Sequence, residues 1–182
     1  LEDFPNKNYL KILEKDLNDG KKKLEVCHKK FKIGLSWKSF KNLYANQKSL
    51  DLRDFDHIVS NNEIDFINLQ YGNINKELID YNNISKSKII NLENLDLQND
   101  FIKIASILKN IDLFITVSNS TAHLAGALGV KTLLIKPFNQ ATFHYWNQPT
   151  TKTPWYKSIE LLDRHIIKDK KKFIEKILSK LN

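Results

Sequence analysis

The 182-residue chain contains no methionine and a single cysteine, Cys27. One cysteine cannot form a disulfide within the chain, which excludes the disulfide framework of small secreted domains and favours a reducing, cytoplasmic location. No apolar run approaches the roughly 20 residues of a membrane-spanning helix, and the acidic beginning LEDFPNKNYL lacks the apolar segment of a secretory signal. Because the first residue is not methionine, we expect the chain to be a piece of a longer protein.

Arginine is also scarce, although the net charge is +8. Arg53 and Arg164 are the only two arginines, whereas nucleic-acid interfaces rely on arginine forks and on basic residues interleaved with aromatic ones. The lysines are spread along the chain, with short clusters at 21–23 and 168–172 on expected surface helices. We therefore interpret the charge as solvated surface and expect no nucleic-acid partner.

Several nucleotide and metal motifs are missing. The five glycines form neither G-x-G-x-x-G nor a P-loop, which argues against dinucleotide dehydrogenases and P-loop NTPases, and there is no G-x-S-x-G hydrolase elbow. The five histidines and Cys27 show no zinc spacing. The sequence DFD at 54–56 resembles the D-x-D of metal-dependent sugar transferases but lies inside a helical pattern. We expect no metal and no cofactor.

The sequence does contain short apolar strands that alternate with helical segments. Strands are predicted at 31–37, 64–72, 88–93, 112–117 and 130–136, with a sixth indicated at 158–163. Helical patterns occur at 8–30 with a break at Gly20, at 50–59 with Ser49 as cap, at 97–111 with Asn99 or Asp100 as cap, after 117 with Gly129 at a left-handed end, and at 168–182. Residues 74–82 form a short helix or a turn.

This alternation predicts an α/β fold: a doubly wound, mostly parallel, Rossmann-like sheet with helices on both faces. The continuous apolar strands agree, because central parallel strands are buried on both sides. We expect one domain over residues 1–182, with a helical lead-in at 1–30, a sheet core at 31–165 and a C-terminal helix at 166–182.

Small polar residues lie where the strand at 112–117 gives way to a helix, and five of them are candidates for a binding site: Ser118, Asn119, Ser120, Thr121 and His123. Ligands of open parallel sheets bind beyond the carboxyl ends of the strands. The unpaired amides and the dipole of a helix start suit a phosphate or diphosphate there. The sequence leaves a plain alternative open, in which Asn119 or Ser120 only caps the helix and His123 packs in the core.

Five segments, taken in order, resemble the C-terminal half of GT-B glycosyltransferases. The similarity is to the bacterial tetratricopeptide-associated group, which is related to the heptosyltransferases of glycosyltransferase family 9 and, more distantly, to O-GlcNAc transferases. The segments are NYLKILEKD at 8–16, KIGLSWKS at 32–39, FINLQYG at 66–72, DLFITVSNSTAHLAGALGVKTLLI at 112–135 and TPWYKSIELL at 153–162. They span nearly the whole chain, and the fourth is the most specific.

The resemblance implies that a nucleotide diphosphate sugar binds this domain, with its diphosphate on the turn at 118–123. His123 matches the family histidine, and Lys48 lies near the family's phosphate-binding lysine. Both would stabilise the leaving diphosphate without a metal, and no residue is assigned as certainly catalytic. Trp37 and Gln70 lie near the ends of predicted strands, so they are further candidates for the same cleft or else packing or loop residues.

The resemblance also implies an acceptor-binding N-terminal domain that is not evident in these residues. We therefore expect a donor-binding half of a hexosyl or heptosyl transferase, inactive alone, whose acceptor is a saccharide or protein bound by the missing domain. Relatives commonly have Asp-Thr where this chain has Ser118-Asn119. That departure motivates an alternative: a degenerate, non-catalytic GT-B-like binding or scaffold module of a tetratricopeptide-repeat protein.

A long loop before the sixth predicted strand is rich in aromatic residues. Tyr145, Trp146, Trp155 and Tyr156 give it an aromatic wall. Such a wall either stacks on a base or sugar or anchors the loop on the core, and the second interpretation is favoured.

Overall fold

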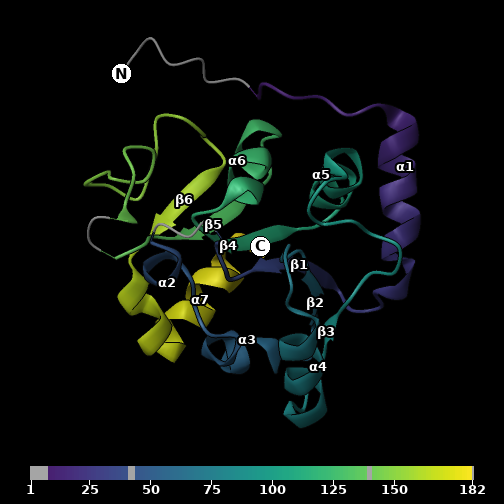
Figure 1. Ribbon diagram of the computed structural model, residues 1–182, viewed down its shortest axis with the longest axis horizontal. Coiled ribbons are helices and arrows are strands. Elements are labelled where there is room, and N and C mark those ends of the chain that lie inside the picture. The colour runs from purple at the N-terminus through teal and green to yellow at the C-terminus, as the bar shows by residue number, and fades with distance from the viewer. Residues whose placement is uncertain (1–7, 41–43, 139–140, 182) are drawn as a thin grey trace.

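A computed structural model describes residues 8–40, 44–138 and 141–181. Its centre is a six-stranded sheet in which every strand pair is parallel, in the order β3-β2-β1-β4-β5-β6 (Figure 1). The strands are β1 (Phe31–Ser36), β2 (Ile64–Asn68), β3 (Ile89–Ile90), β4 (Leu113–Val117), β5 (Thr132–Ile135) and β6 (Ile159–Leu162). The α/β fold predicted from the sequence, including the sixth strand, is confirmed.

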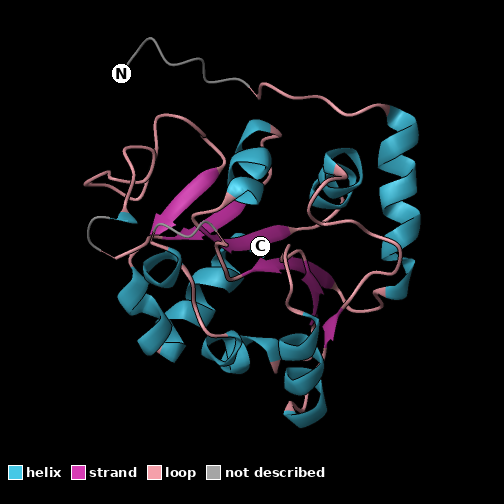
Figure 2. Ribbon diagram, viewed as in Figure 1, coloured by secondary structure: helices cyan, strands magenta, loops and turns pink. Residues whose placement is uncertain are grey.

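Helices cover both faces of the sheet (Figures 1 and 2). One face carries α1 (Glu14–Lys23), α5 (Phe101–Lys109) and α6 (Ser120–Ala127), and the other carries α3 (Asp56–Val59), α4 (Asn75–Ile84) and α7 (Lys170–Leu181). Shorter elements are α2 (Ala45–Lys48) and the 3-10 turns η1 (Leu24–Val26), η2 (Leu52–Phe55) and η4 (Arg164–Lys168). Part of the predicted helical lead-in, residues 1–7, lies outside the described residues.

Alternating side chains of the strands build the two halves of the core. Ile33 and Ile115 pack on the face of α3, α4 and α7, whereas Ile67 and Phe114 pack on the face of α5 and α6. All four residues are fully buried, as expected for central parallel strands.

The strand order reverses between β1 and β4. The chain runs outward from β1 to β2 and β3, and then returns to the other side of β1 with β4. The segment after β1 leads toward α3 on one face, and the segment after β4 leads into α6 on the opposite face. Connections that diverge in this way leave a crevice at the carboxyl ends of the two strands, where open α/β sheets bind ligands.

The first helix differs from its prediction. Helix α1 begins at Glu14 and continues through Gly20, so the predicted break there is wrong. Gly20 serves close packing instead, because a Cβ at this position would lie 2.6 Å from the carbonyl oxygen of Ser106 on α5. Residues 8–13 are not helical, and the amides of Tyr9 and Leu10 both donate to the carbonyl of Ala127.

Helix capping agrees with the sequence at one site and differs at another. Asp100 caps α5 by accepting from the Lys103 amide at 3.0 Å, one of the two predicted options. Ser49 is not the cap of the segment at 50–59, because Asp51 caps η2 and forms a capping box with Asp54. Asp54 is therefore used by the fold, and the helical interpretation of DFD holds. Gly129 has the predicted left-handed conformation, with φ of 70°.

Candidate functional site

A cavity of about 360 Å³ lies at the carboxyl ends of β1 and β4, the point where the strand order reverses. We call it the Lys48–His123 cavity. Its lining residues are Ser39, Lys48, Tyr71, Ser118, Asn119, Ser120, His123, Phe143 and Tyr145. Five of the eight predicted site residues are among them. Lys48 and His123, which are far apart in the sequence, thus face one space.

Helix α6 opens onto this cavity. The Asn119 side chain caps the helix, since its Oδ1 accepts from the Ala122 amide at 3.0 Å. The amides of Ser120 and Thr121 precede the first position that can bond within the helix, so they have no intrahelical acceptor. Together with the helix dipole, they make this end of α6 attractive to an anion.

The polar atoms of Ser118 and Asn119 are largely used by the protein itself. The Trp146 indole donates to Ser118 Oγ at 3.0 Å, and Asn119 Nδ2 donates to Ser36 Oγ at 2.8 Å. Ser118 and Asn119 are only 5% and 7% exposed. The plain alternative of a capping role is therefore confirmed for Asn119, while ligand contacts by either residue remain predictions.

His123 lies within a cluster of aromatic rings. Its ring centroid is 4.9 Å from those of Tyr145 and Trp146, and its Nδ1 is 3.0 Å from the Tyr156 hydroxyl. Burial, and to a smaller extent the nearby His144, lower the pKa of His123 below its ordinary value. The lowered pKa favours the neutral ring at pH 7. When Tyr156 donates to Nδ1, the proton resides on Nε2, which makes the ring a hydrogen-bond donor suited to a phosphate oxygen.

Lys48 contributes the positive charge of the cavity. Its side chain is almost fully buried, with 3% exposure, and its Nζ lies 4.2 Å from the centroid of the Phe143 ring. A lysine ammonium is a compact charge with three donors, and an aromatic face stabilises such a charge. Such a group, partly removed from water, has a strong electrostatic attraction for a phosphate.

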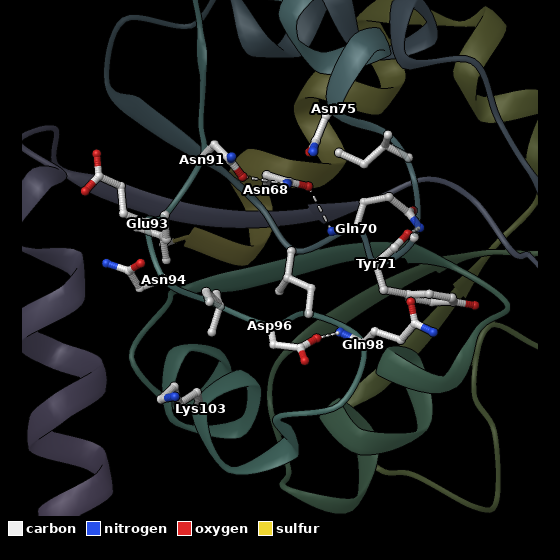
Figure 3. A pocket seen from close by; sticks show the side chains of 15 residues that line it. Asn68, Gln70, Tyr71, Asn75, Asn91, Glu93, Asn94, Asp96, Gln98 and Lys103 are labelled. Carbon is white, nitrogen blue, oxygen red and sulfur yellow. Dashed lines mark hydrogen bonds between the residues drawn. The ribbon is translucent and has the colours of Figure 1, made fainter.

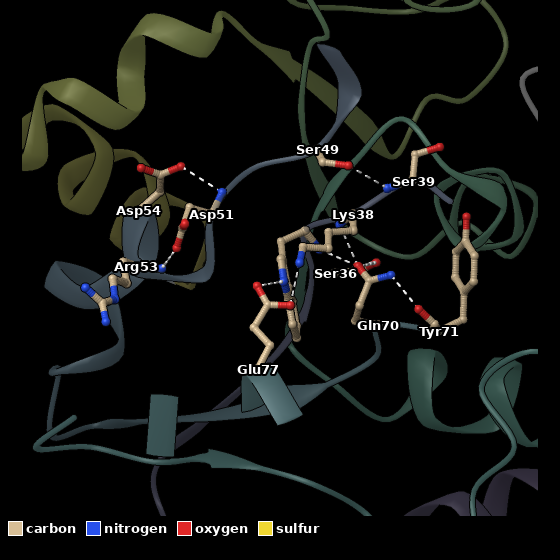
Figure 4. A network of polar contacts seen from close by, with 11 residues as sticks. Ser36, Lys38, Ser39, Ser49, Asp51, Arg53, Asp54, Gln70, Tyr71 and Glu77 are labelled. Atoms are coloured by element: carbon tan, nitrogen blue, oxygen red, sulfur yellow. Dashed lines mark hydrogen bonds and ion pairs between the residues drawn. The ribbon is translucent and has the colours of Figure 1, made fainter. Parts of the chain in front are cut away.

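The other predicted site residues lie outside this cavity. Trp37 is fully buried in the core, and its Nε1 is 3.3 Å from Glu77 Oε1. Gln70 is 1% exposed, and its Oε1 accepts from Ser36 Oγ at 3.0 Å and from the amides of Trp37 and Lys38 at 2.7 and 2.6 Å (Figure 4). Thr121 lines a neighbouring cavity. Trp37 and Gln70 thus have contacts within the fold, and ligand contacts by either residue remain predictions.

A second, larger cavity of about 600 Å³ lies beside β2 and β3 and was not predicted (Figure 3). Side-chain amides dominate its lining: Asn68, Gln70, Asn75, Asn91, Asn94 and Gln98. Tyr71 lines this amide-rich cavity, the Lys48–His123 cavity and the one between them. The sequence offered one signal that could have pointed to it: Asn68 and Asn91 lie within the second and third predicted strands, and Asn94 directly follows the third.

The aromatic loop is anchored on the core, as the favoured interpretation holds. Trp146 is fully buried and packs with Ala122, Leu134 and Leu161. Tyr156 packs against Gly126 of α6, where a Cβ would clash with its ring. Tyr145 differs from these two residues, because it also lines the Lys48–His123 cavity.

Two further properties concern the described part of the chain. No described helix combines the length and apolar character needed to cross a bilayer. Within 8–40, 44–138 and 141–181, no group of three or more His, Cys, Asp or Glu side chains is placed to share a metal ion.

Comparisons with known proteins extend these observations. No protein-family model matches the chain. In sequence it is 29% identical over 161 residues to Protein FlbA of Caulobacter vibrioides, which covers 87% of this chain and 26% of that protein. The chain thus spans about a quarter of the length of this relative.

Solved structures match the fold closely. A glycosyl transferase family 9 protein of Veillonella parvula superposes with a TM-score of 0.69 at 13% identity, covering 95% of this chain and 53% of that one. The E. coli ADP-heptose lps heptosyltransferase II superposes with a TM-score of 0.67 at 11% identity, covering 94% and 53%. The chain shares its fold with these glycosyltransferases. It spans about half of the length of each, and identities this low concern the fold alone.

Proposed function

We propose that the chain is the nucleotide-sugar-binding part of a glycosyltransferase, and that the donor diphosphate occupies the Lys48–His123 cavity. The observation that carries the proposal is the convergence of Lys48, His123 and the start of α6 on one space where the strand order reverses. The structural similarity to two glycosyltransferases, one named for an ADP-linked sugar, supports it.

The chemistry of sugar transfer explains the need for these groups. The bond between the anomeric carbon and the diphosphate oxygen breaks, the nucleoside diphosphate leaves with the electron pair, and an acceptor hydroxyl forms the new bond to the anomeric carbon. Negative charge therefore grows on the diphosphate. Fixed donors aimed at that charge, here the Lys48 ammonium, the α6 amides and His123, stabilise the transition state more than the ground state.

We further propose that the nucleoside lies toward the amide-rich cavity. Tyr71 borders both cavities, so a ligand that extends past it can reach the side-chain amides. Amides carry both donors and acceptors, which suits the polar edge of a base. The acceptor and the base that removes its proton are proposed to come from a separate domain, as the sequence resemblance implies.

A second candidate function is a non-catalytic module with the same fold. The uses of Ser118 and Asn119 favour it, because the polar side chains that stand where relatives commonly have Asp-Thr are engaged with Trp146 and Ser36. Such a module would keep the sheet and the packed loop, but it would have no need to bind a nucleotide.

Calorimetric titration with UDP, ADP and GDP separates the two candidates. The proposed function predicts that at least one diphosphate binds and that the corresponding nucleoside without phosphates binds much more weakly. No heat of binding for any of the three at millimolar concentration would favour the non-catalytic module. Equal affinities for a nucleoside and its diphosphate would place the phosphates in solvent and contradict the assignment of the cavity.

A further inference from the structure

We propose that Arg164 is a positioning residue that fixes the turn carrying Lys48, so that the Lys48 ammonium meets the diphosphate. The inference rests on the proposed function for its ligand, but the contact between Arg164 and the turn is independent of it. It assigns a role to one of the two arginines of the chain, which lies far from Lys48 in the sequence.

The Arg164 guanidinium forms hydrogen bonds with the backbone on both sides of Lys48. Its Nη1 donates to the carbonyl oxygen of Gln47 at 2.8 Å, and its Nη2 donates to the carbonyl oxygen of Ser49. Gln47 and Ser49 are the two immediate neighbours of Lys48. The planar fork of arginine suits two acceptors at a fixed spacing, whereas a lysine ammonium has no such geometry.

The guanidinium is itself held in place. It follows β6 at the start of η4, at the carboxyl edge of the sheet where the cavity lies. The Phe138 ring covers it, with 4.5 Å between the ring centroid and Cζ, and the Phe138 amide donates to the same Gln47 carbonyl at 3.3 Å. A half-buried donor in this setting cannot exchange its partners freely with water.

The turn needs such support because it is short and begins in an unfavourable conformation. Helix α2 has four residues, and Tyr44 before it has a positive φ of 65°, which is unusual for a bulky side chain. A single helical turn is not stable alone. Carbonyls at the end of a helix also lack intrahelical donors, and a cation there complements the dipole. Arg164 meets both requirements.

Alternative explanations make a different prediction. If Arg164 served only general packing, its removal would weaken the whole domain and would affect Lys48 no more than other residues. If it acts through Lys48, the effect of removing it on diphosphate binding must vanish once the Lys48 ammonium is gone. A double-mutant cycle measures this dependence directly.

The test compares wild type, Arg164→Ala, Lys48→Met and the double variant, by titration with the nucleoside diphosphate that binds wild type best. We expect Arg164→Ala to weaken binding about tenfold in the wild-type background and hardly at all in the Lys48→Met background. Arg164→Lys should restore little, because it keeps the charge but loses the fork. Arg53→Ala, which removes the exposed second arginine, is the matched control and should leave affinity unchanged.

Amide hydrogen exchange of the segment at 44–50 provides a readout that needs no ligand. Arg164→Ala should speed exchange in this segment, while the strands of the sheet keep their protection. If diphosphate binds but the effects of Arg164→Ala and Lys48→Met simply add, the positioning role is overturned. If wild type binds no diphosphate, the proposed function fails. In that case, unchanged exchange at 44–50 would also overturn the grip of Arg164 on the turn.

Discussion

Two polar regions lie next to each other at the carboxyl edge of the sheet, yet their side chains serve different ends. In the Gln70 network, Gln70 Oε1 gathers donors from Ser36, Trp37 and Lys38, and the chain's own groups satisfy one another (Figure 4). In the Lys48–His123 cavity, a cation, a neutral imidazole and a helix start border an open space.

The difference shows that polar residues after a parallel strand can have two roles: some hold the walls of the crevice in place, and others are available to bind a ligand. Asn119 belongs to both regions, because it caps α6 and donates to Ser36 beside Gln70. The network thereby ties the end of β1 to the start of α6. The following predictions test whether the first region supplies stability and the second supplies binding.

Removing the centre of the network should have the largest effect. Gln70→Leu leaves the Ser36 hydroxyl and the amides of Trp37 and Lys38 without their acceptor, which should lower the free energy of unfolding by about 3–5 kcal/mol. Chemical denaturation measures the loss. Gln98→Leu, the same change at an exposed glutamine, is the matched control. A loss below about 1 kcal/mol for Gln70→Leu would mean that water replaces the side chain.

Removing the charge of the cavity should affect binding rather than folding. Lys48→Met keeps most of the buried stem but removes the ammonium, so affinity for a nucleoside diphosphate should fall roughly 10- to 100-fold, as for a lost charge-assisted contact. Titration calorimetry measures the change. Lys152→Met, which removes a lysine at an exposed position beside β6, is the matched control. Equal losses for both variants would reduce the effect to net charge.

Tyr156, which contacts His123, packs closely against Gly126 of α6, so a larger residue at position 126 should destabilise the protein. Gly126→Ala drives a methyl group into the Tyr156 ring, and we expect the protein to lose about 1–2 kcal/mol of stability even though alanine favours helices. Thermal denaturation measures the loss. In a Tyr156→Ala background the clash is absent, so the same substitution should stabilise the protein. Destabilisation in both backgrounds would point to a cause other than the ring.

The smallest effect should appear in the pH dependence of stability. Burial, followed by the nearby Lys170, lowers the pKa of His57, whose Nε2 is buried without a hydrogen-bond partner in the described part of the chain. Below pH 6.5 the unfolded chain therefore binds a proton that the folded chain does not. Stability should fall as the pH drops from about 7 toward 5, by a fraction of the roughly 1.4 kcal/mol per pH unit of one fully linked proton.

Replacing the ring tests this linkage. His57→Gln should flatten the dependence over that window, as measured by denaturation at a series of pH values. His28→Gln removes an exposed histidine and serves as the control. If the two variants flatten the curve equally, burial of His57 is not the cause.

The sheet could be predicted because its signals are local and repeated. The strand that becomes β4 is apolar apart from Thr116, and the change from strand to small-residue helix at 118–120 is visible in the sequence. The convergence of Lys48 and His123 was predicted only through resemblance to a family, since nothing in the sequence near Lys48 shows that its turn folds against α6.

Other features depend on contacts between distant residues and could not be predicted. From the sequence alone Gly20 is interpreted as a helix breaker. The structure shows that glycine is needed there because Ser106 of α5 leaves no room for a Cβ. Gln70 Oε1 accepts from three donors of β1 and the segment after it, and the sequence gives no sign of these contacts. Arg164 follows β6, whereas Gln47 and Ser49 follow β1. Their hydrogen bonds join segments that are far apart in the sequence, so only the folded chain reveals them.

The central claim is that the first amides of α6 face the cavity and bind phosphate. A two-dimensional ¹H–¹⁵N titration with inorganic pyrophosphate tests it most directly. We predict saturable downfield shifts of the Ser120 and Thr121 amide protons, with smaller shifts in the Lys48→Met variant. If these two amides stay unchanged while wild type binds pyrophosphate, the anion binds elsewhere and the assignment of the cavity is contradicted.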